Sequence, residues 1–234
     1  MQFELIKNIT LKEQSWKNKI FLTFDMDWCS DEVLSYTVDL LEAFDVPATF
    51  FVTHETFLLD RLRENKKFDL GIHPNFNPLL HERNIQNINA EDTVMANMSI
   101  VPEAKAVRAH SLVQSSKILD IYKKIGLEYD LSTYLPWHTF NMINPVEHIN
   151  GLIRLFHFWE DDIELMNNNM YSSIPISGYL QIYDFHPIHI YLNSCNLEAY
   201  QKAKNNPQKI ENYINNLTQG VRDYLVDLIK KYGK

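Results

Sequence analysis

The residues from Ile20 to Trp28 constrain the fold more than any other segment of the chain. They read I-F-L-T-F-D-M-D-W, an apolar run that ends in two carboxylates, Asp25 and Asp27. Such runs of β-branched and aromatic residues are typical of strands buried on both faces of a parallel sheet. Because residues i and i+2 of an extended chain point to the same side, the two carboxylates should converge. Converging like charges are costly unless a cation or a shared proton relieves them, so we expect a metal ion here.

The rest of the chain alternates between strand and helix patterns. Further strands are predicted at 48–52, 68–72, 104–108 and 179–185, and helices after Ser30, around 55–64, at 115–125 and from Val221 onward. This order implies right-handed crossovers and a parallel sheet, either a barrel or a doubly wound sheet. The stretch 141–177 shows the least regular pattern, and we expect it to be rich in loops.

Size and charge limit the classes of function. The chain has 234 residues, 45% of them hydrophobic, which is ordinary for a globular protein and long enough for one α/β domain. We interpret residues 1–234 as a single domain, with 1–19 as an N-terminal extension packed on it. The net charge of −8 and the lack of a basic cluster argue against nucleic acid or an anionic membrane as partners.

Other features of the composition concern location. No apolar stretch approaches the ~20 residues of a membrane span, and the first residues lack the apolar core of a signal peptide. The two cysteines are too few for a disulfide scaffold. We therefore expect a cytoplasmic protein without a membrane span.

Polar side chains follow several predicted strands at the point where each strand ends. After Asp25 and Asp27 come His73, Arg108 and His186, and His110 lies just beyond Arg108. Sites in barrels and in doubly wound sheets lie at the carboxyl ends of the strands. The sequence therefore predicts that these side chains meet at one rim of the sheet.

Asp27 and His73 are the best candidates for metal ligands, because a carboxylate and an imidazole together suit Zn²⁺ or a similar divalent ion. The third protein ligand stays open among Asn77, His110 and His81. Asn77 offers an amide oxygen, which is a weaker donor than an imidazole. The alternative interpretation is structural: Asp27 would cap the following helix, and His73 would bond a buried carbonyl.

Acid–base roles fall to other residues of the same rim. Asp25 would serve as the general base, with Arg108 as a partner that keeps it ionised. His186 would be the acid that protonates a leaving group, and His189 would be an alternative acid or a support for it.

Candidate substrate contacts lie near the same strand ends. In the segment F-W-E-D-D, Trp159 could stack on a sugar ring, and the carboxylates of Glu160, Asp161 and Asp162 could accept from hydroxyls. The alternative there is an exposed acidic loop with one buried tryptophan. Trp28, Asn75 and His189 complete the predicted substrate-binding set. The chain has no glycine-rich phosphate loop and no G-x-S-x-G elbow.

Several of these segments carry a family resemblance. The chain resembles the polysaccharide deacetylase family (NodB homology, carbohydrate esterase family 4) and is most similar to its WbmS-like branch, which is associated with bacterial surface-polysaccharide gene sets. The matching segments are L-T-F-D-M-D-W at 22–28, A-T-F-F-V-T-H at 48–54, G-I-H-P-N-F-N-P-L-L at 71–80, V-R-A-H-S-L-V-Q-S-S at 107–116, F-W-E-D-D at 158–162 and D-F-H-P-I-H-I-Y-L-N at 184–193. They follow the family's order.

The resemblance implies a distorted (β/α) barrel of about seven parallel strands and a divalent metal, most commonly Zn²⁺, with Co²⁺, Fe²⁺, Ni²⁺ or Mn²⁺ as alternatives. It makes Asp25 the base, Asp27 and His73 metal ligands, Arg108 the residue that contacts the base, and His186 the acid. The family's second metal histidine falls four residues after the first, where this chain has Asn77. The arginine motif normally continues with proline two residues on, where this chain has His110. We therefore hypothesise that His110 replaces the missing ligand.

The function predicted is that of a metal-dependent carbohydrate deacetylase, a hydrolase that removes an N-acetyl or other acyl group from an amino sugar in bacterial surface-polysaccharide biosynthesis. The expected substrate is nucleotide-linked, lipid-linked or an oligosaccharide. Two alternatives remain: a deformylase or other C–N amide hydrolase, and a catalytically silent sugar-binding protein that lost its metal through Asn77.

Overall fold

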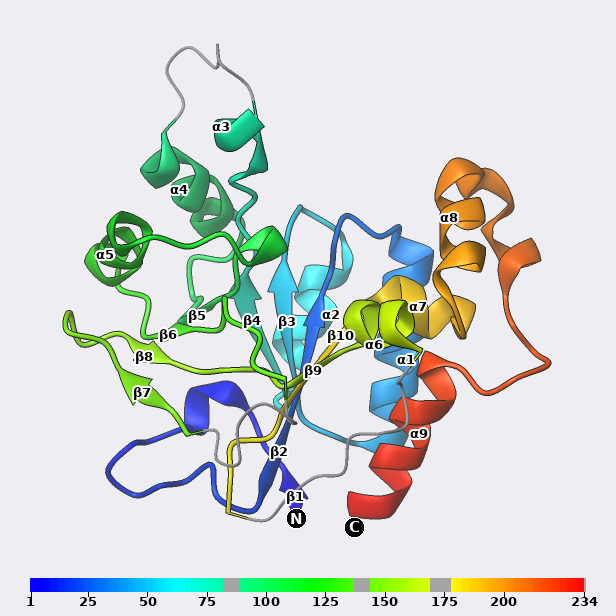
Figure 1. Ribbon diagram of the computed structural model, residues 1–234, viewed down its shortest axis with the longest axis horizontal. Helices are drawn as coiled ribbons and strands as arrows, with labels where there is room; N and C mark the ends of the chain where they lie inside the picture. The colour runs from blue at the N-terminus through cyan, green and yellow to red at the C-terminus, as the bar shows by residue number, and fades with distance from the viewer. Residues whose placement is uncertain (82–88, 137–143, 169–177, 234) are drawn as a thin grey trace.

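One curled, mostly parallel sheet organises the molecule. The computed structural model describes residues 1–81, 89–136, 144–168 and 178–233. The described strands form a ten-stranded sheet in the order β7-β8-β6-β5-β4-β3-β2-β10-β9, with β1 paired to β2 (Figure 1). The strands are β1 (Gln2–Phe3), β2 (Lys19–Asp25), β3 (Ala48–Val52), β4 (Phe68–Ile72), β5 (Ala106–Val107), β6 (Tyr129–Asp130), β7 (Val146–Glu147), β8 (Ile153–Arg154), β9 (Trp159–Glu160) and β10 (Ile182–Phe185). This half-barrel confirms the predicted distorted (β/α) barrel.

Helices cover the outside of the curled sheet. They are α1 (Asp31–Phe44), α2 (Leu58–Glu64), α3 (Asn77–His81), α4 (Ala90–Ile100), α5 (Ser116–Ile125), α6 (Asp161–Asn167), α7 (Pro187–Leu192), α8 (Leu197–Asn205) and α9 (Val221–Tyr232), with the short 3-10 turns η1 (Ile6–Asn8), η2 (His110–Leu112) and η3 (Pro207–Tyr213). In Figure 1, α4 and α5 lie beyond the β4–β6 side, and α1, α7 and α9 lie on the side of β2 and β10.

Strand β2 lies in the middle of the sheet because its side chains are apolar on both faces. It pairs in parallel with β3 on one side and with β10 on the other. The ring of Phe24 stacks on Phe50 at 5.2 Å and on Phe185 at 5.6 Å between centroids, so aromatic contacts join the three strands. The buried strand predicted from the apolar run is confirmed.

Two helix ends follow from single residues. The Ser30 hydroxyl accepts a hydrogen bond from the Val33 backbone N–H and so caps the start of α1. Gly126 ends α5 at φ 99°, a left-handed conformation that glycine adopts without steric cost. The predictions of a helix after Ser30 and of a helix stopped by Gly126 are both confirmed.

The stretch 141–177 is more regular than its composition predicts. Its described residues contain β7, β8, β9 and α6, and β8 and β9 both belong to the sheet. Each of these strands is two residues long, too short for an alternating pattern to stand out. Their pairing with β6 and β10 therefore decides their conformation. The expectation of a loop-rich stretch was wrong for this part.

The N-terminal segment 1–19 packs on the rest. Strand β1 pairs with the first residues of β2, and Leu5, Ile6, Ile9 and Trp16 are buried. The division into domains stays a prediction. Among the helices within the described ranges, none combines the length and apolarity needed to cross a lipid bilayer.

Candidate active site

Backbone hydrogen bonds just beyond the strand ends place the candidate residues at one rim of the sheet. The Met26 N–H donates to the Phe51 carbonyl, which continues the β2–β3 ladder past Asp25. The His73 N–H likewise donates to the Val52 carbonyl, and the His110 N–H donates to the Pro74 carbonyl. The loops after β2, β4 and β5 are thereby held against one another, as expected for the carboxyl ends of parallel strands.

Three of the rim side chains converge on one point. His73 Nε2 and His110 Nδ1 each lie 3.1 Å from Asp27 Oδ1, and the two ring nitrogens are 3.3 Å apart. Burial opposes ionisation of Asp27, but its hydrogen bonds with His110 and His73 hold the pKa of this carboxyl well below its usual range. The carboxylate is therefore an anion at neutral pH, ready to act as a ligand.

This donor set fits a catalytic metal ion. Two imidazoles and one carboxylate match the three protein ligands that catalytic zinc sites use, and both histidines direct a ring nitrogen to the same carboxylate oxygen. Asn77 lies outside the cluster, since its side-chain amide donates to Ser111 Oγ at 3.0 Å. The geometry therefore favours His110 over Asn77 as the third ligand. The side chain of His81 lies outside the described part of the chain.

Arg108 connects the second aspartate of the rim to β10. The side chain is completely buried, and its Nη1 donates to Asp25 Oδ1 at 2.8 Å and also to Asp184. Its Nη2 donates to Thr23 Oγ1 at 2.9 Å, and the guanidinium lies over the ring of Phe51 at 4.7 Å from the centroid. This cation compensates the buried charge of Asp25 and fixes the direction of its carboxylate.

His186 lies on the other side of Asp27. Its Nε2 is 3.6 Å from Asp27 Oδ2, whereas its Nδ1 contacts Asp161 Oδ1 at 2.7 Å. Burial alone would lower the pKa of His186, but the charge and hydrogen bond of Asp161 raise it well above the usual value. The raised pKa favours the protonated imidazole, which is the state that a general acid needs.

A parallel pair lies one helical turn further along. His189, which is buried, bonds Asp162 Oδ1 through Nε2 at 2.7 Å and Ser194 Oγ through Nδ1 at 2.9 Å. Burial raises the pKa of Asp162, but the hydrogen bond from His189 and the electrostatic effect of His186 and His189 together outweigh burial and lower this pKa to about 2. Asp162 is therefore a fixed anion beside the site.

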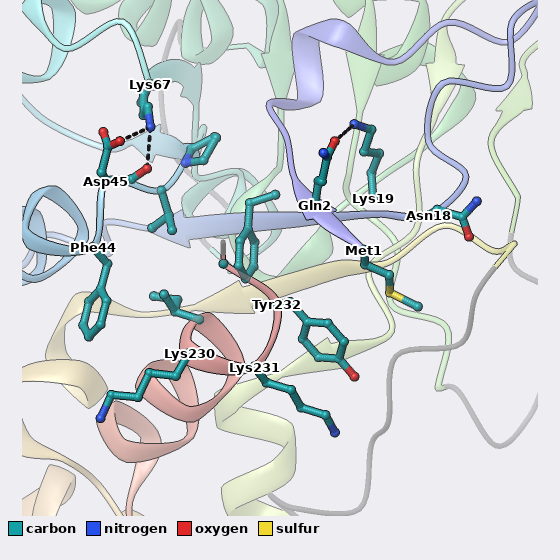
Figure 2. Close-up of a pocket in the computed structure, with 15 residues that line it drawn as sticks. Met1, Gln2, Asn18, Lys19, Phe44, Asp45, Lys67, Lys230, Lys231 and Tyr232 are labelled. Carbon is teal, nitrogen blue, oxygen red and sulfur yellow. Dashed lines mark hydrogen bonds and ion pairs between the residues drawn. The ribbon is translucent and has the colours of Figure 1, made fainter.

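A separate cavity lies at the opposite end of the sheet. It has a volume of about 1130 Å³ and is lined by residues around the amino ends of β1, β2 and β3 and the end of α9 (Figure 2). Two of its lysines are engaged: Lys19 with Gln2 at 2.7 Å, and Lys67 with the Asp45 carbonyl at 2.6 Å. It contains none of the candidate site residues, and we assign it no role.

Comparisons with known proteins bear on this rim. The model of the WbmS-like polysaccharide deacetylase family matches residues 22–204. A crystal structure from Bordetella bronchiseptica, described as a polysaccharide deacetylase involved in O-antigen biosynthesis, superposes with a TM-score of 0.91 at 34% identity, over 98% of both chains. The chain belongs to the WbmS-like polysaccharide deacetylase family.

More distant structures share less of the chain. A family 4 carbohydrate esterase from Streptomyces lividans, in complex with acetate, has a TM-score of 0.46 at 11% identity over 72% of this chain and 78% of its own. An acetyl xylan esterase of the same family from Clostridium thermocellum, with a cobalt ion, has a TM-score of 0.38 at 14% identity over 72% and 73%. A search of curated proteins finds no match.

The residues predicted to contact substrate in this WbmS-like protein lie in different surroundings, and some of them are exposed whereas others are buried. Trp28 is 48% exposed beside His110. Asn75 uses its side-chain oxygen to accept from the Asn77 N–H at 2.9 Å, which shapes the loop before α3. Asp162 is partly exposed. His189 is 1% exposed and bonds the Asp162 carboxylate, so the prediction that His189 contacts the substrate directly was wrong.

Trp159 also lies elsewhere than predicted. Its side chain has 0% exposure, and its ring stacks on Tyr224 of α9 at 4.7 Å between centroids. In β9 the side chain of Trp159 points into the core, because the sheet here is covered by α9. The prediction that Trp159 stacks on a sugar ring was wrong.

Sequence reasoning missed two residues of the site. It treated Asp161 as a hydroxyl acceptor within an acidic loop, whereas Asp161 holds His186 through both its backbone N–H and its ring, each at 2.7 Å. It also left out Thr23, which supports Arg108. The sequence carried no usable signal for Asp161, because β9 is two residues long and was not predicted as a strand, so the rule of strand ends could not be applied there.

Proposed function

We propose that this protein is a metal-dependent hydrolase that removes an acetyl or other acyl group from an amino sugar during surface-polysaccharide biosynthesis. The observation that carries the proposal is the cluster of Asp27, His73 and His110 with Asp25 on one side and His186 on the other. Membership of the polysaccharide deacetylase family and the O-antigen description of the Bordetella relative support it.

Asp27, His73 and His110 would hold the divalent ion, most reasonably Zn²⁺ given two nitrogen donors and one oxygen donor. When bound, such an ion supplies Lewis-acid polarisation of the acyl carbonyl and makes water easier to deprotonate. The neighbouring side chains then decide where protons go.

Asp25 would accept the proton of the attacking water. Arg108 donates to one carboxylate oxygen, Oδ1, whereas Oδ2 lies 3.5 Å from His73 Nδ1, an atom without a hydrogen-bond partner among the described residues. One oxygen of Asp25 is therefore fixed by a cation, and the other faces the ligand cluster. A base held in this way needs no reorientation before proton transfer.

His186 would protonate the departing nitrogen of the sugar. Its Nδ1 is occupied by Asp161, so the proton available for transfer is on Nε2, the atom nearest Asp27. The base and the acid thus approach the ligand cluster from different strands, β2 and β10, and the scissile C–N bond would lie between them.

The test begins with metal-depleted protein reconstituted with Zn²⁺, Co²⁺ or Mn²⁺. Nucleotide-linked and lipid-linked N-acetyl amino sugars, the cytoplasmic precursors expected from the sequence, are the first substrates, and released acetate is measured. Acetate release that requires both metal and Asp25 would support the proposal. Formate release would favour the deformylase alternative, and sugar binding without any release would favour the silent binding protein.

The ligand assignment is tested separately by metal content. His110→Ala should lose bound Zn²⁺, whereas Asn77→Ala should retain about one ion per chain, because the Asn77 amide points to Ser111. His148→Ala is a matched control, since His148 bonds Asn150 of its own loop at 2.9 Å. Retention of zinc by His110→Ala together with its loss from Asn77→Ala would contradict the assignment.

A further inference from the structure

The turn that carries the candidate metal ligand Asp27 has an unfavourable residue at its tip. The Cys29 N–H donates to the Met26 carbonyl at 2.9 Å, which closes a four-residue turn. Its two central residues, Asp27 and Trp28, have φ of 41° and 54°. Positive φ at both central positions is typical of type I′ turns, which favour Asn or Asp followed by Gly.

Trp28 therefore has a left-handed backbone conformation that is unfavourable for a bulky residue. A left-handed backbone brings the Cβ of a bulky residue close to its own carbonyl, and a glycine at this place would avoid that contact. Such strain persists only where the surroundings hold it, and it concentrates at functional sites. Here the Trp28 N–H donates to Thr53 Oγ1 at 3.1 Å, and Thr53 is itself buried, so the residue that directly follows β3 holds the turn in place.

Burial of the Trp28 side chain compensates little for this strain, because much of the side chain stays in contact with solvent. Trp28 remains 48% exposed, and its indole meets the ring of His110 in a T-shaped contact with centroids 5.1 Å apart. The other tryptophans of the described chain, Trp16 and Trp159, are buried in the core. A strained and half-exposed tryptophan that touches a candidate ligand is placed where a substrate would arrive.

We propose that Trp28 is the sugar-stacking platform of this site: its exposed indole face receives the apolar face of an N-acetylated pyranose ring and so sets the acyl group over Asp27, His73 and His110. Indole is the largest aromatic surface available to a side chain, and its two torsion angles make it inexpensive to order. The inference rests on the proposed function for the identity of the acyl sugar, but stacking itself requires no turnover.

The experiment measures binding of tri-N-acetylchitotriose by calorimetry, in zinc-loaded protein that carries Asp25→Asn so that the sugar is not consumed. We expect Trp28→Gly to weaken binding by about tenfold or more, as for truncation of a central aromatic contact, and Trp28→Phe to weaken it less. Phe57→Ala is the matched control, because Phe57 is 75% exposed and lies at the start of α2, outside the cluster of Asp27, His73 and His110. Its binding should equal that of the parent.

Thermal melting separates this role from a structural one. Because glycine suits the turn, Trp28→Gly should keep or raise the melting temperature while it loses the sugar, and zinc content should stay near one per chain. A lowered melting temperature with unchanged sugar affinity would show that Trp28 serves the fold and would overturn the inference. Failure of the parent protein to bind the sugar would overturn it as well. If sugar binding depends on Trp28 but the protein releases no acetate, the stacking role of Trp28 would be supported and only the proposed hydrolase function would be rejected.

Discussion

Asp25 and Asp27 are separated by one residue in sequence but have different partners. Asp25 is 4% exposed and bonds Arg108, whereas Asp27 contacts the rings of His73 and His110. β2 ends at Asp25, and Asp27 lies in the turn that follows with a φ of 41°, so the turn rather than strand alternation sets the position of Asp27. The neighbouring strands give each carboxylate its own environment. One is therefore suited to move a proton and the other to hold a cation.

Paired substitutions should separate these two roles. Asp25→Asn is expected to lower turnover by about 10²–10⁴-fold, the usual contribution of a general base, while bound metal is retained. Asp27→Asn should lose the metal, because an amide oxygen is a weaker ligand than a carboxylate. Metal content by elemental analysis and acetate release on the same preparations are the measurements. Equal loss of metal in both variants would contradict the division of roles.

At the scale of single elements, α6 carries an unusual buried acid. Glu164 is 3% exposed, and its buried Oε2 has no hydrogen-bond partner among the described residues. Burial raises the pKa of Glu164 from 4.5 to about 7. The folded protein therefore binds this proton more tightly than the unfolded chain does. The stabilisation is complete below pH about 4.5 and is lost as the pH rises through about 7.

Glu164→Gln should remove this dependence on pH. The difference in unfolding free energy, variant minus parent, is expected to grow by on the order of 1 kcal/mol between pH 5 and pH 8. Urea unfolding at several pH values measures it. The exposed Glu211, changed to glutamine, serves as the control and should give the same difference at each pH. A constant difference for Glu164→Gln would mean that this carboxyl is already ionised in the folded protein at pH 5.

The elements also show what the sequence can predict. β2, β3 and β4 are each at least five residues long and consist mostly of apolar residues, so local pattern is enough to place them. β5, β6, β8 and β9 are two residues long, and only their neighbours in the sheet hold them extended. Local periodicity carries no information at that length.

The candidate site divides in the same way. The rule that sites form at the carboxyl ends of parallel strands is enough to bring Asp25, Asp27, His73, Arg108 and His186 together, although their roles remain predictions. The direction in which a side chain points was harder to predict. Trp159 turns into the core because α9 covers it, and Asp161 turns toward His186 because β9 pairs with β10. Both outcomes depend on residues far away in sequence.

At the scale of the whole molecule, the three proposed metal ligands come from three separate loops. Asp27 follows β2, His73 follows β4 and His110 lies in η2 after β5. An ion bound there cross-links these loops in the folded state only, so it should stabilise the fold as a whole.

Metal removal should therefore lower the melting temperature. At a free zinc concentration of 100 times the dissociation constant, binding stabilises the folded state by about 2.7 kcal/mol. This free energy corresponds to a rise in melting temperature of roughly 5–10 °C for a protein of this size. Differential scanning calorimetry before and after exhaustive chelation measures the shift. His110→Ala should melt at the same temperature with and without chelator, and an equal shift in that variant would place the stabilising ion elsewhere.

The position of β10 beside β2 has a consequence for how the chain is made. The hydroxyl of Thr23 bonds the carbonyl of Tyr183, 160 residues later. On the ribosome, where about 5–20 residues are added per second, one edge of β2 therefore waits roughly ten seconds or more for its neighbour. An unpaired apolar edge is a template for association with other chains. Nascent chains of this protein, and any product truncated before β10, are thus natural clients for chaperones that shield unfinished sheets.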